Sequence, residues 1–407
     1  MTFVTRICDG GCRRMSARTL GRRASAVAAN FTAAGELVAA VLPALPGSGP
    51  SSAADVTSAW LTRRLASATP GAAAQRISRL DGTTGTTDRR RLAVEWNDQG
   101  RAAGLPGYLF VKSTPLSAKN RTMVAALGMA VNEARFYNEA ADELGGVAPR
   151  SWYARAGLGA RFLIVLEDIV AAGGRPYALA DICDIGHAQG LIDAFATLHA
   201  RFWESPRLLG DLSWIRTWST RPGYGVLKTF YSRGRRGALR RERPEVTPAV
   251  RAVAAALDTH ADAYYREFES GPLTLLHGDS HLGNTFAWAD GRSGLLDWQV
   301  VWRGPGLREV SYWMTSGLEP EMRRAAERDL IARYLEGLGA HGVKDVPAFD
   351  TAFDRYRLFA AEAWDATAMT INWPGLQARQ NADAAFRRTC AAVEDLDTAA
   401  LMNRLYR

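Results

Sequence analysis

A polar loop of eight residues stands between an apolar run and a hairpin signal in the second half of the chain. The loop reads HGDSHLGN at 277–284, and segments with strand character follow it at 285–288 and 295–298. Between these segments, the dipeptide Asp-Gly at 290–291 is a strong signal for a tight hairpin turn. Such a hairpin brings Asp297 back toward the polar loop. The sequence therefore predicts a fold that collects several oxygen-bearing side chains in one short region.

Three of these side chains have the chemistry that phosphoryl transfer requires. Asp279 can orient an acceptor hydroxyl and take its proton. Asn284 and Asp297 offer hard oxygen atoms, which suit Mg²⁺ better than zinc. Protein kinases use the order H-R-D-x-x-x-x-N and then D-F-G, with the same spacing from Asp to Asn. The alternative is a purely structural one, in which Asp279 and Asn284 cap a polar loop and Asp297 lies in a turn. Under this alternative, the kinase-like order of these residues would be a coincidence.

The string HGDSHLGN and the LDWQ that follows at 296–299 resemble the signature of the aminoglycoside phosphotransferase and choline-kinase-like superfamily. This resemblance implies an α+β, bilobal protein-kinase-like fold with a small sheet-containing N-lobe and a mainly helical C-lobe. It also implies Asp279 as the catalytic base and Asn284 and Asp297 as Mg²⁺ ligands. His277 matches a position that braces the loop.

Other segments agree with this resemblance. The segment GLREVSYW at 306–313 is similar to a family stretch in which Asp is usual where this chain has Glu309. The finer pattern, with GTT, LPxxLFVK, LEDI and LDWQ, looks closer to the ecdysteroid-kinase-like branch than to the resistance enzymes. We therefore do not expect aminoglycosides to be the acceptor.

The first part of the chain is predicted to form a small α+β unit. Helical periodicity covers 122–143. Short strand patterns occur at 77–80, 91–96, 109–112 and 162–166. After about residue 175 the pattern is mainly helical. The expected organisation is an extension at 1–54, poorly ordered or partly helical, then a nucleotide-binding N-lobe at 55–170 and a C-lobe with the catalytic loop and acceptor site at 171–407.

Lys112 ends an apolar strand, and Glu133 lies on the helix that follows. A buried lysine is costly unless it is paired with a carboxylate or with phosphates. The kinase pattern supplies both, because its lysine holds nucleotide phosphates and a helix glutamate orients that lysine. The alternative is a strand-end lysine whose ammonium reaches water. The string NEARFY at 132–137 resembles the family's R-E-x-x-F-Y and selects Glu133 over Glu139 and Glu143.

Two further segments are candidates for nucleotide contact. The string GTTGTT at 82–87 is expected to be a tight loop whose backbone N–H groups and hydroxyls face phosphates. Its candidate binding residues are Gly82, Thr84, Gly85 and Thr86. The string LEDI at 166–169 resembles the hinge between lobes that reads an adenine through backbone groups, with Glu167 and Ile169 as candidates. The resemblance thus implies ATP and Mg²⁺ as cofactors.

Composition limits the other classes of function. With 47% apolar and 23% charged residues, the chain is globular, and it lacks the run of about 18 apolar residues that a membrane helix needs. The net charge of +8 fits an anionic ligand such as a nucleotide, and no nucleic-acid-binding signature accompanies it. Four cysteines form no disulfide framework, which favours a reducing, cytoplasmic location. The basic run at 233–243 is interpreted as a solvated face, with recognition of an anionic acceptor as the lesser alternative.

Three functions remain open from the sequence. The leading one is a metabolic kinase that phosphorylates a hydroxyl of a small molecule. A catalytically silent, kinase-like scaffold is the alternative from another class, although it has no need to retain Asp279, Asn284, Asp297 and Lys112 together. Transfer of AMP instead of phosphate is the most remote. Neither the acceptor nor the oligomeric state follows from these motifs.

Overall fold

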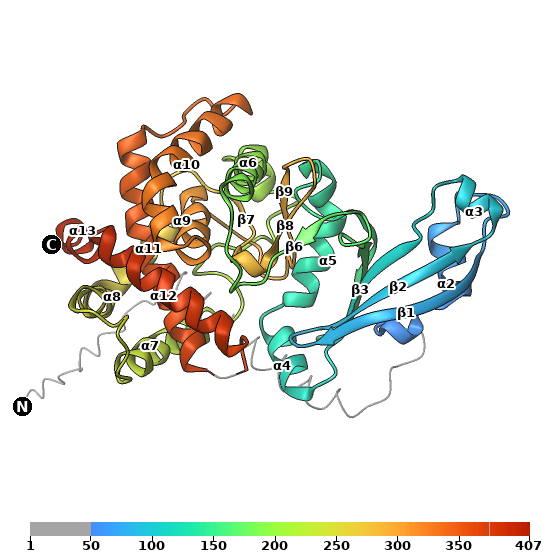
Figure 1. Cartoon of the computed structure of the whole chain (residues 1–407), viewed down its shortest axis with the longest axis horizontal. Helices are drawn as coiled ribbons and strands as arrows, with labels where there is room; N and C mark the ends of the chain where they lie inside the picture. The colour runs from blue at the N-terminus through green and yellow to red at the C-terminus, as the bar shows by residue number, and fades with distance from the viewer. Residues whose placement is uncertain (1–49, 374) are drawn as a thin grey trace, which may run out of the picture.

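The protein has two parts, an antiparallel sheet with a few helices at one end and a larger group of helices at the other (Figure 1). The computed structural model describes residues 50–373 and 375–407, so the predicted extension lies outside the described residues except for 50–54. This arrangement confirms the predicted α+β class, with a sheet-containing N-terminal part and a mainly helical C-terminal part.

The large sheet is entirely antiparallel, in the order β1-β2-β3-β5-β4. Its strands are β1 (Ala74–Thr84), β2 (Asp88–Trp96), β3 (Tyr108–Ser113), β4 (Ser151–Ala156) and β5 (Phe162–Glu167). The helices η1 (Ala53–Asp55), α2 (Ser58–Leu65) and α3 (Asp98–Ala102) accompany it. Trp60 and Leu61 of α2 join Leu109 and Val111 of β3 in a small core on one face. The other face of the sheet is thereby left for the second part of the protein.

One strand in this region was not predicted, and one expected helix is corrected. Strand β4 was missed because it is an edge strand whose side chains are almost all half-buried and show no apolar alternation. The helix expected at 122–143 is divided into α4 (Ala118–Ala126) and α5 (Met129–Glu139), followed by η2 (Ala141–Leu144). The break lies at Gly128, whose φ of +68° is readily available only to glycine.

Helices form most of the second part, and α9 and α11 lie at its centre. Every residue of α9 is buried, and α11 packs against α7, α9 and α12. The α-helices are α6 (Ile185–Phe202), α7 (Tyr224–Leu239), α8 (Pro248–Arg266), α9 (Gly306–Gly317), α10 (Pro320–Ala340), α11 (Phe349–Asn372), α12 (Arg379–Asp395) and α13 (Thr398–Leu405). The short turns of 3-10 helix are η3 (Pro206–Leu208), η4 (Glu267–Glu269) and η5 (Leu282–Asn284). None of the helices in the described ranges is both long and apolar enough to span a bilayer.

Short strands frame the polar loop. Strand β7 (Thr274–Leu276) pairs with β10 (Trp302–Gly304), while β6 (Arg175–Pro176), β8 (Thr285–Ala287) and β9 (Ser293–Leu295) form a second small sheet. The hairpin expected at 290–291 is present between β8 and β9. The returning strand ends at Leu295, however, and not at residue 298. The Leu296 N–H still bonds the Asn284 carbonyl at 2.8 Å, and the extended backbone ends at Asp297, which adopts a φ of +66°.

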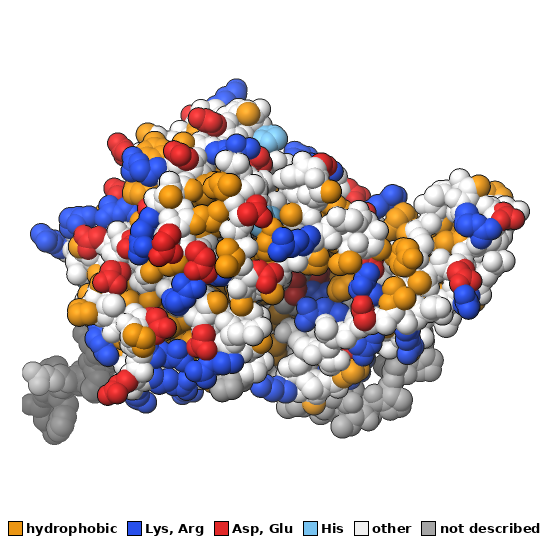
Figure 2. All heavy atoms as spheres, viewed as in Figure 1, with side chains coloured by type: hydrophobic (Ala, Val, Ile, Leu, Met, Phe, Trp, Pro, Cys, Tyr) orange, Lys and Arg blue, Asp and Glu red, His pale blue; other side chains and the backbone are white. Residues whose placement is uncertain are grey.

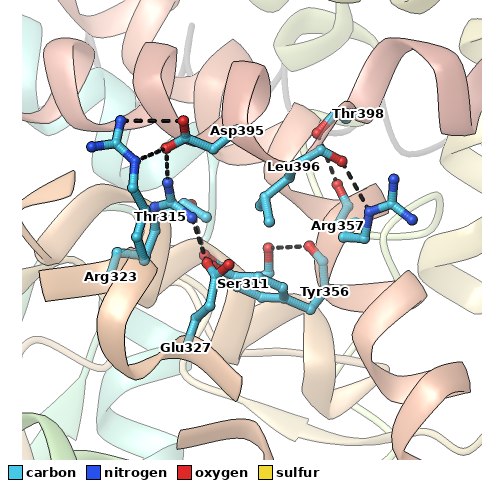
Figure 3. A network of polar contacts seen from close by, with 10 residues as sticks. Ser311, Thr315, Arg323, Glu327, Tyr356, Arg357, Asp395, Leu396 and Thr398 are labelled. Atoms are coloured by element: carbon cyan, nitrogen blue, oxygen red, sulfur yellow. Dashed lines mark hydrogen bonds and ion pairs between the residues drawn. The ribbon is translucent and has the colours of Figure 1, made fainter. Parts of the chain in front are cut away.

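A buried ionic network fastens α10, α11 and α12 together (Figure 3). The Arg323 side chain is fully buried and forms ion pairs with Glu327 and Asp395. Tyr356 of α11 donates to Glu327 at 2.8 Å. The neighbouring Arg324 also binds Asp395, at 2.8 Å, but its side chain is 48% exposed. Two adjacent arginines thus share one carboxylate in very different surroundings.

We predict that Arg323→Ala destabilises the protein by about 3–5 kcal/mol, because it leaves the buried carboxylate of Glu327 without its cation. The control Arg324→Ala removes an exposed pair and is expected to cost about 1 kcal/mol or less. Urea unfolding of both variants measures the difference. Equal losses in the two variants would show that burial does not set the strength of this network.

Candidate active site

A cavity of about 290 Å³ lies between the sheet and the helical part, and most of the predicted site residues line it. Figure 2 shows the hollow, with acidic and basic side chains at its opening. The sheet side contributes Gly82, Thr83, Arg89, Phe110, Lys112 and Glu133. The segment after β5 contributes Leu166, Glu167, Asp168 and Ile169. The helical part contributes Asn284, Leu296 and Asp297.

Lys112 stands at the centre of this cavity. Its Nζ donates to Glu133 Oε1 at 2.8 Å and lies 2.7 Å from Oε2, and it donates to Asp297 Oδ1 at 2.5 Å. The Lys112 and Glu133 side chains are almost completely buried, whereas that of Asp297 is 19% exposed. The alternative of an ammonium that reaches water is therefore wrong. Helix α5 turns Glu133 toward the lysine, whereas Glu139 of the same helix binds Arg135 and Glu143 in η2 binds Arg207.

The three charges support one another electrostatically. Burial alone would lower the pKa of Lys112, but the carboxylates of Asp297 and Glu133 outweigh it and raise that pKa. Burial would raise the pKa of Asp297, but Lys112 holds it below its ordinary value. For Glu133 burial prevails over Lys112 and raises the pKa to about 7. Lys112 and Asp297 thus form a charged pair at neutral pH.

The polar loop is braced from two directions. His277 Nε2 lies 2.7 Å from the Leu296 carbonyl, and the Asp279 N–H donates to its Nδ1 at 3.2 Å. Both contacts are satisfied by a neutral imidazole with its proton on Nε2, and burial accordingly lowers the pKa of His277. Gly278 has a φ of +90°, and a Cβ there would lie 2.4 Å from the Val300 carbonyl oxygen. His277 therefore ties the loop to the segment that carries Asp297.

Glu309 on α9 provides the second brace. Its carboxylate accepts the N–H groups of His277 and Gly278 at 2.7 and 2.8 Å, and His199 Nε2 lies 3.4 Å away. Burial alone would raise the pKa of Glu309, but the hydrogen bond and charge of His199 outweigh it and lower the pKa to about 2. A glutamate thus anchors the loop where the family usually has the shorter aspartate.

Asp279 lies at the end of this braced loop and is 36% exposed. Its Oδ1 accepts a hydrogen bond from the Tyr312 hydroxyl at 3.1 Å, and His281 Nε2 is 3.8 Å from Oδ2. Asn284 donates through Nδ2 to the Asp279 carbonyl at 2.8 Å, which directs its amide oxygen elsewhere. Tyr312 was not anticipated, although its place one helical turn after Glu309 puts it on the same face of α9.

The glycine- and threonine-rich segment differs from expectation. The expected loop at 82–87 is shorter, because Gly82 and Thr84 pair with Arg90 and Asp88 as strand residues. Only 85–87 form the turn, in which the Gly85 N–H bonds the Thr87 carbonyl at 3.1 Å. Of this segment only Gly82 and Thr83 line the cavity. The structure therefore does not bring Thr84, Gly85 and Thr86 into the lining.

The predicted hinge lies at the edge of the cavity. Glu167 and Ile169 both line it, and the Ile169 carbonyl already accepts the Gly174 N–H at 2.8 Å. Asp168 between them is buried and accepts from Arg91 Nε at 2.7 Å. Sequence reasoning missed this pair, because nothing local links β2 to the end of β5. The pair fixes the hinge segment to the sheet.

The oxygen donors fit a magnesium ion that shares its ligands with phosphate. The described residues contain no group of three or more His, Cys, Asp or Glu side chains that could hold a metal ion. Asn284 and Asp297 line the same cavity and supply one amide and one carboxylate. Mg²⁺ in nucleotide sites is commonly held by one or two carboxylates together with substrate phosphates.

The chain belongs to the phosphotransferase enzyme family, whose model matches residues 133–348, just over half of the sequence. The match covers Glu133 and the whole polar loop, and it confirms the resemblance drawn from the motifs. The comparison with curated proteins finds no match.

Solved structures similar to this chain are distant. An ethanolamine kinase from Plasmodium vivax is 10% identical, with a TM-score of 0.46, and 78% of this chain and 81% of that chain are covered. A choline/ethanolamine kinase family protein from Mesorhizobium loti is 17% identical, with a TM-score of 0.45 and coverage of 82% and 92%. A macrolide 2'-phosphotransferase from Brachybacterium faecium is 15% identical, with a TM-score of 0.44 and coverage of 81% and 95%. At these values the likeness carries no conclusion about substrate.

We predict that Glu309→Gln lowers stability at pH 7 by about 2–3 kcal/mol, because the amide turns an N–H toward backbone donors. The pKa of Glu309 is about 2 in the folded protein against an ordinary 4.5. Its contribution is therefore present above about pH 4.5 and is lost as the pH falls toward 2. Urea unfolding from pH 7 to pH 3 should show wild type and variant converging. The exposed Glu336→Gln is the control, and parallel pH profiles for Glu309→Gln and wild type would contradict the assignment.

Proposed function

We propose that this protein is an ATP-dependent kinase that transfers a phosphoryl group to a hydroxyl of a small molecule. The observation that carries the proposal is the single cavity in which Lys112, Glu133, Asn284 and Asp297 meet, with Asp279 on the adjoining loop. These residues come from the sheet, from α5 and from the helical part. Residues 55–170 would act as the nucleotide-binding lobe and 171–407 as the lobe that holds the acceptor.

In this proposal Lys112 binds phosphate oxygens of the nucleotide. Glu133 holds the ammonium in place, since two short contacts join the pair in a buried site. Asn284 and Asp297 would hold Mg²⁺, which would supply positive charge against the charge that develops on the phosphates. Glu167 and Ile169 would meet the base at the hinge. Gly82 would be the loop residue closest to the phosphates, because the cavity reaches it.

Asp279 has the environment that a general base for a hydroxyl needs. Tyr312 donates to Oδ1 and so fixes the carboxylate, which leaves Oδ2 to accept a proton from the acceptor. The partial exposure of Asp279 lets a small molecule approach from solvent. The acceptor is thus proposed to be a small hydroxyl compound, with neither nucleic acid nor membrane as a partner. The reducing environment expected from the cysteines supports a cytoplasmic location for this reaction.

We predict that Asp279→Asn reduces phosphoryl transfer by about 10²–10⁴-fold while nucleotide affinity stays near that of the wild type. The two side chains are nearly isosteric, so only the proton acceptor is lost. A panel of hydroxyl metabolites, scored for ATP-dependent phosphorylation, first identifies the acceptor and then measures the variant. Undiminished turnover in a folded variant would remove Asp279 from the chemistry. Nucleotide binding without turnover of any acceptor by the wild type would favour the silent scaffold.

We predict that Lys112→Arg weakens nucleotide binding by about tenfold or more and abolishes turnover, although the charge is retained. Arginine is longer, planar and forked, and it does not replace a compact ammonium between Glu133 and phosphate. Nucleotide titration and turnover are the measurements, and the exposed Lys344→Arg is the control. Equal behaviour of the two variants would show that Lys112 does not contact phosphate.

A further inference from the structure

Arg89 lies directly beside Lys112 on the face of the sheet that lines the cavity. The register of β2 and β3 pairs Arg89 with Lys112, and both residues line the cavity. Side chains paired across an antiparallel ladder point to the same face, about 5 Å apart at Cβ. The next pair along the ladder is Arg90 with Val111, and Val111 is completely buried in the core beneath α2. Arg90 and Arg91 also belong to the lining of the cavity.

The guanidinium of Arg89 has no partner among the described residues. Its Nε is buried and makes no hydrogen bond, and no acidic side chain forms an ion pair with it. The two arginines that follow are both engaged. Arg90 lies 2.8 Å from Asp88, and Arg91 lies 2.7 Å from Asp168. Of these three consecutive arginines, Arg89 alone keeps its donors free at the cavity.

The charges beside Lys112 show what Arg89 contributes. Lys112 is already paired with the carboxyl groups of Glu133 and Asp297. The charge of Arg89 acts on both carboxyl groups and favours their ionised forms. Arg89 therefore adds a second positive charge next to an ammonium that two carboxyl groups already engage. Two like charges opposite each other on a ladder are unfavourable unless an anion lies between them.

The turn at 85–87 places Arg89 where a phosphate-binding loop was expected. A Cβ on Gly85 would lie 3.1 Å from Arg89 Nη2, so the tip of the hairpin lies against the guanidinium. The Gly85 N–H is already bonded within the turn and is not available to phosphate. A guanidinium offers a rigid fork of donors that matches two phosphate oxygens at once. The Arg89 side chain can therefore supply the phosphate-binding donors that were expected from backbone N–H groups of the loop at 82–87.

We infer that Arg89 binds the terminal phosphates of the nucleotide beside Lys112 and makes affinity depend on the number of phosphates. The inference rests on the proposed nucleotide-binding function and names a specificity determinant within that site. A nucleoside di- or triphosphate reaches both cations, whereas a monophosphate does not bridge them. Arg89 is thus the residue that selects the polyphosphate.

The test is the affinity of the full chain for ATP, ADP and AMP in the presence of Mg²⁺ at fixed ionic strength. Arg89→Gln is expected to weaken ATP and ADP binding by about ten- to hundredfold and AMP binding by about threefold or less. The matched control is Arg79→Gln, which makes the same charge change on an exposed residue of β1. Arg79 pairs with the buried Leu92, so it lies on the opposite face of the sheet. This control is expected to leave all three affinities unchanged.

Three outcomes decide the matter. A selective loss of ATP and ADP binding, partly restored in Arg89→Lys, supports the inference. An equal loss for all three nucleotides, or no loss, overturns it while the proposed function stands on Lys112→Arg. Absence of nucleotide binding in the wild type overturns the proposed function itself. Thermal unfolding of each variant checks that the sheet is intact, and Arg89→Lys keeps the test valid if Arg89→Gln does not fold.

Discussion

The buried ion pairs of Lys112 with Glu133 and Asp297 hold the two parts of the protein in a common site. Removing a charge from water costs several kcal/mol, and attraction repays it only with short, well-directed contacts. Here contacts of 2.5–2.8 Å join β3, α5 and a loop that follows 185 positions after Lys112. An apolar contact runs alongside, since Phe136 of α5 stacks on Trp298 at 3.9 Å. Helix α5 thus contributes both the carboxyl group of Glu133 and the aromatic ring of Phe136 to this group of contacts.

Hydrogen bonds connect the polar loop to the segment that carries Asp297 and to helix α9. His277 binds the carbonyl next to Asp297, and Glu309 binds two N–H groups of the loop from α9. Arg308, beside Glu309, pairs with Glu362 of α11 at 2.7 Å and reaches the Gly278 carbonyl at 3.3 Å. These groups are buried, so they cannot relax without leaving polar atoms unpaired. The position of the loop that carries Asp279 is therefore set by contacts within the protein, which is the condition for electrostatic preorganisation.

The cations of the cavity differ from the other buried arginines in how they are paired with acidic side chains. Most buried arginines here are neutralised by acids, as Arg235 is by Asp258 and Asp365. The cavity is lined by four cations, Arg89, Arg90, Arg91 and Lys112, and by five carboxylates, Asp81, Glu133, Glu167, Asp168 and Asp297. Arg90, Arg91 and Lys112 form ion pairs with carboxylates. Among the described residues, no carboxylate forms an ion pair with Arg89, whose buried Nε has no hydrogen-bond partner.

The sequence by itself determined the local chemistry. Asp279 and Asn284 lie on one short loop, a Gly-containing turn makes the hairpin, and Lys112 ends an apolar strand. Only the tertiary structure decided which partners these residues meet. Glu139 bonds Arg135 and Trp214, so it is Glu133 that faces the lysine. Strand pairing shortened the loop at 82–87, created the edge strand β4 and set Arg89 beside Lys112. Register and helix rotation arise from contacts between distant segments, and a local pattern of residue types does not encode them.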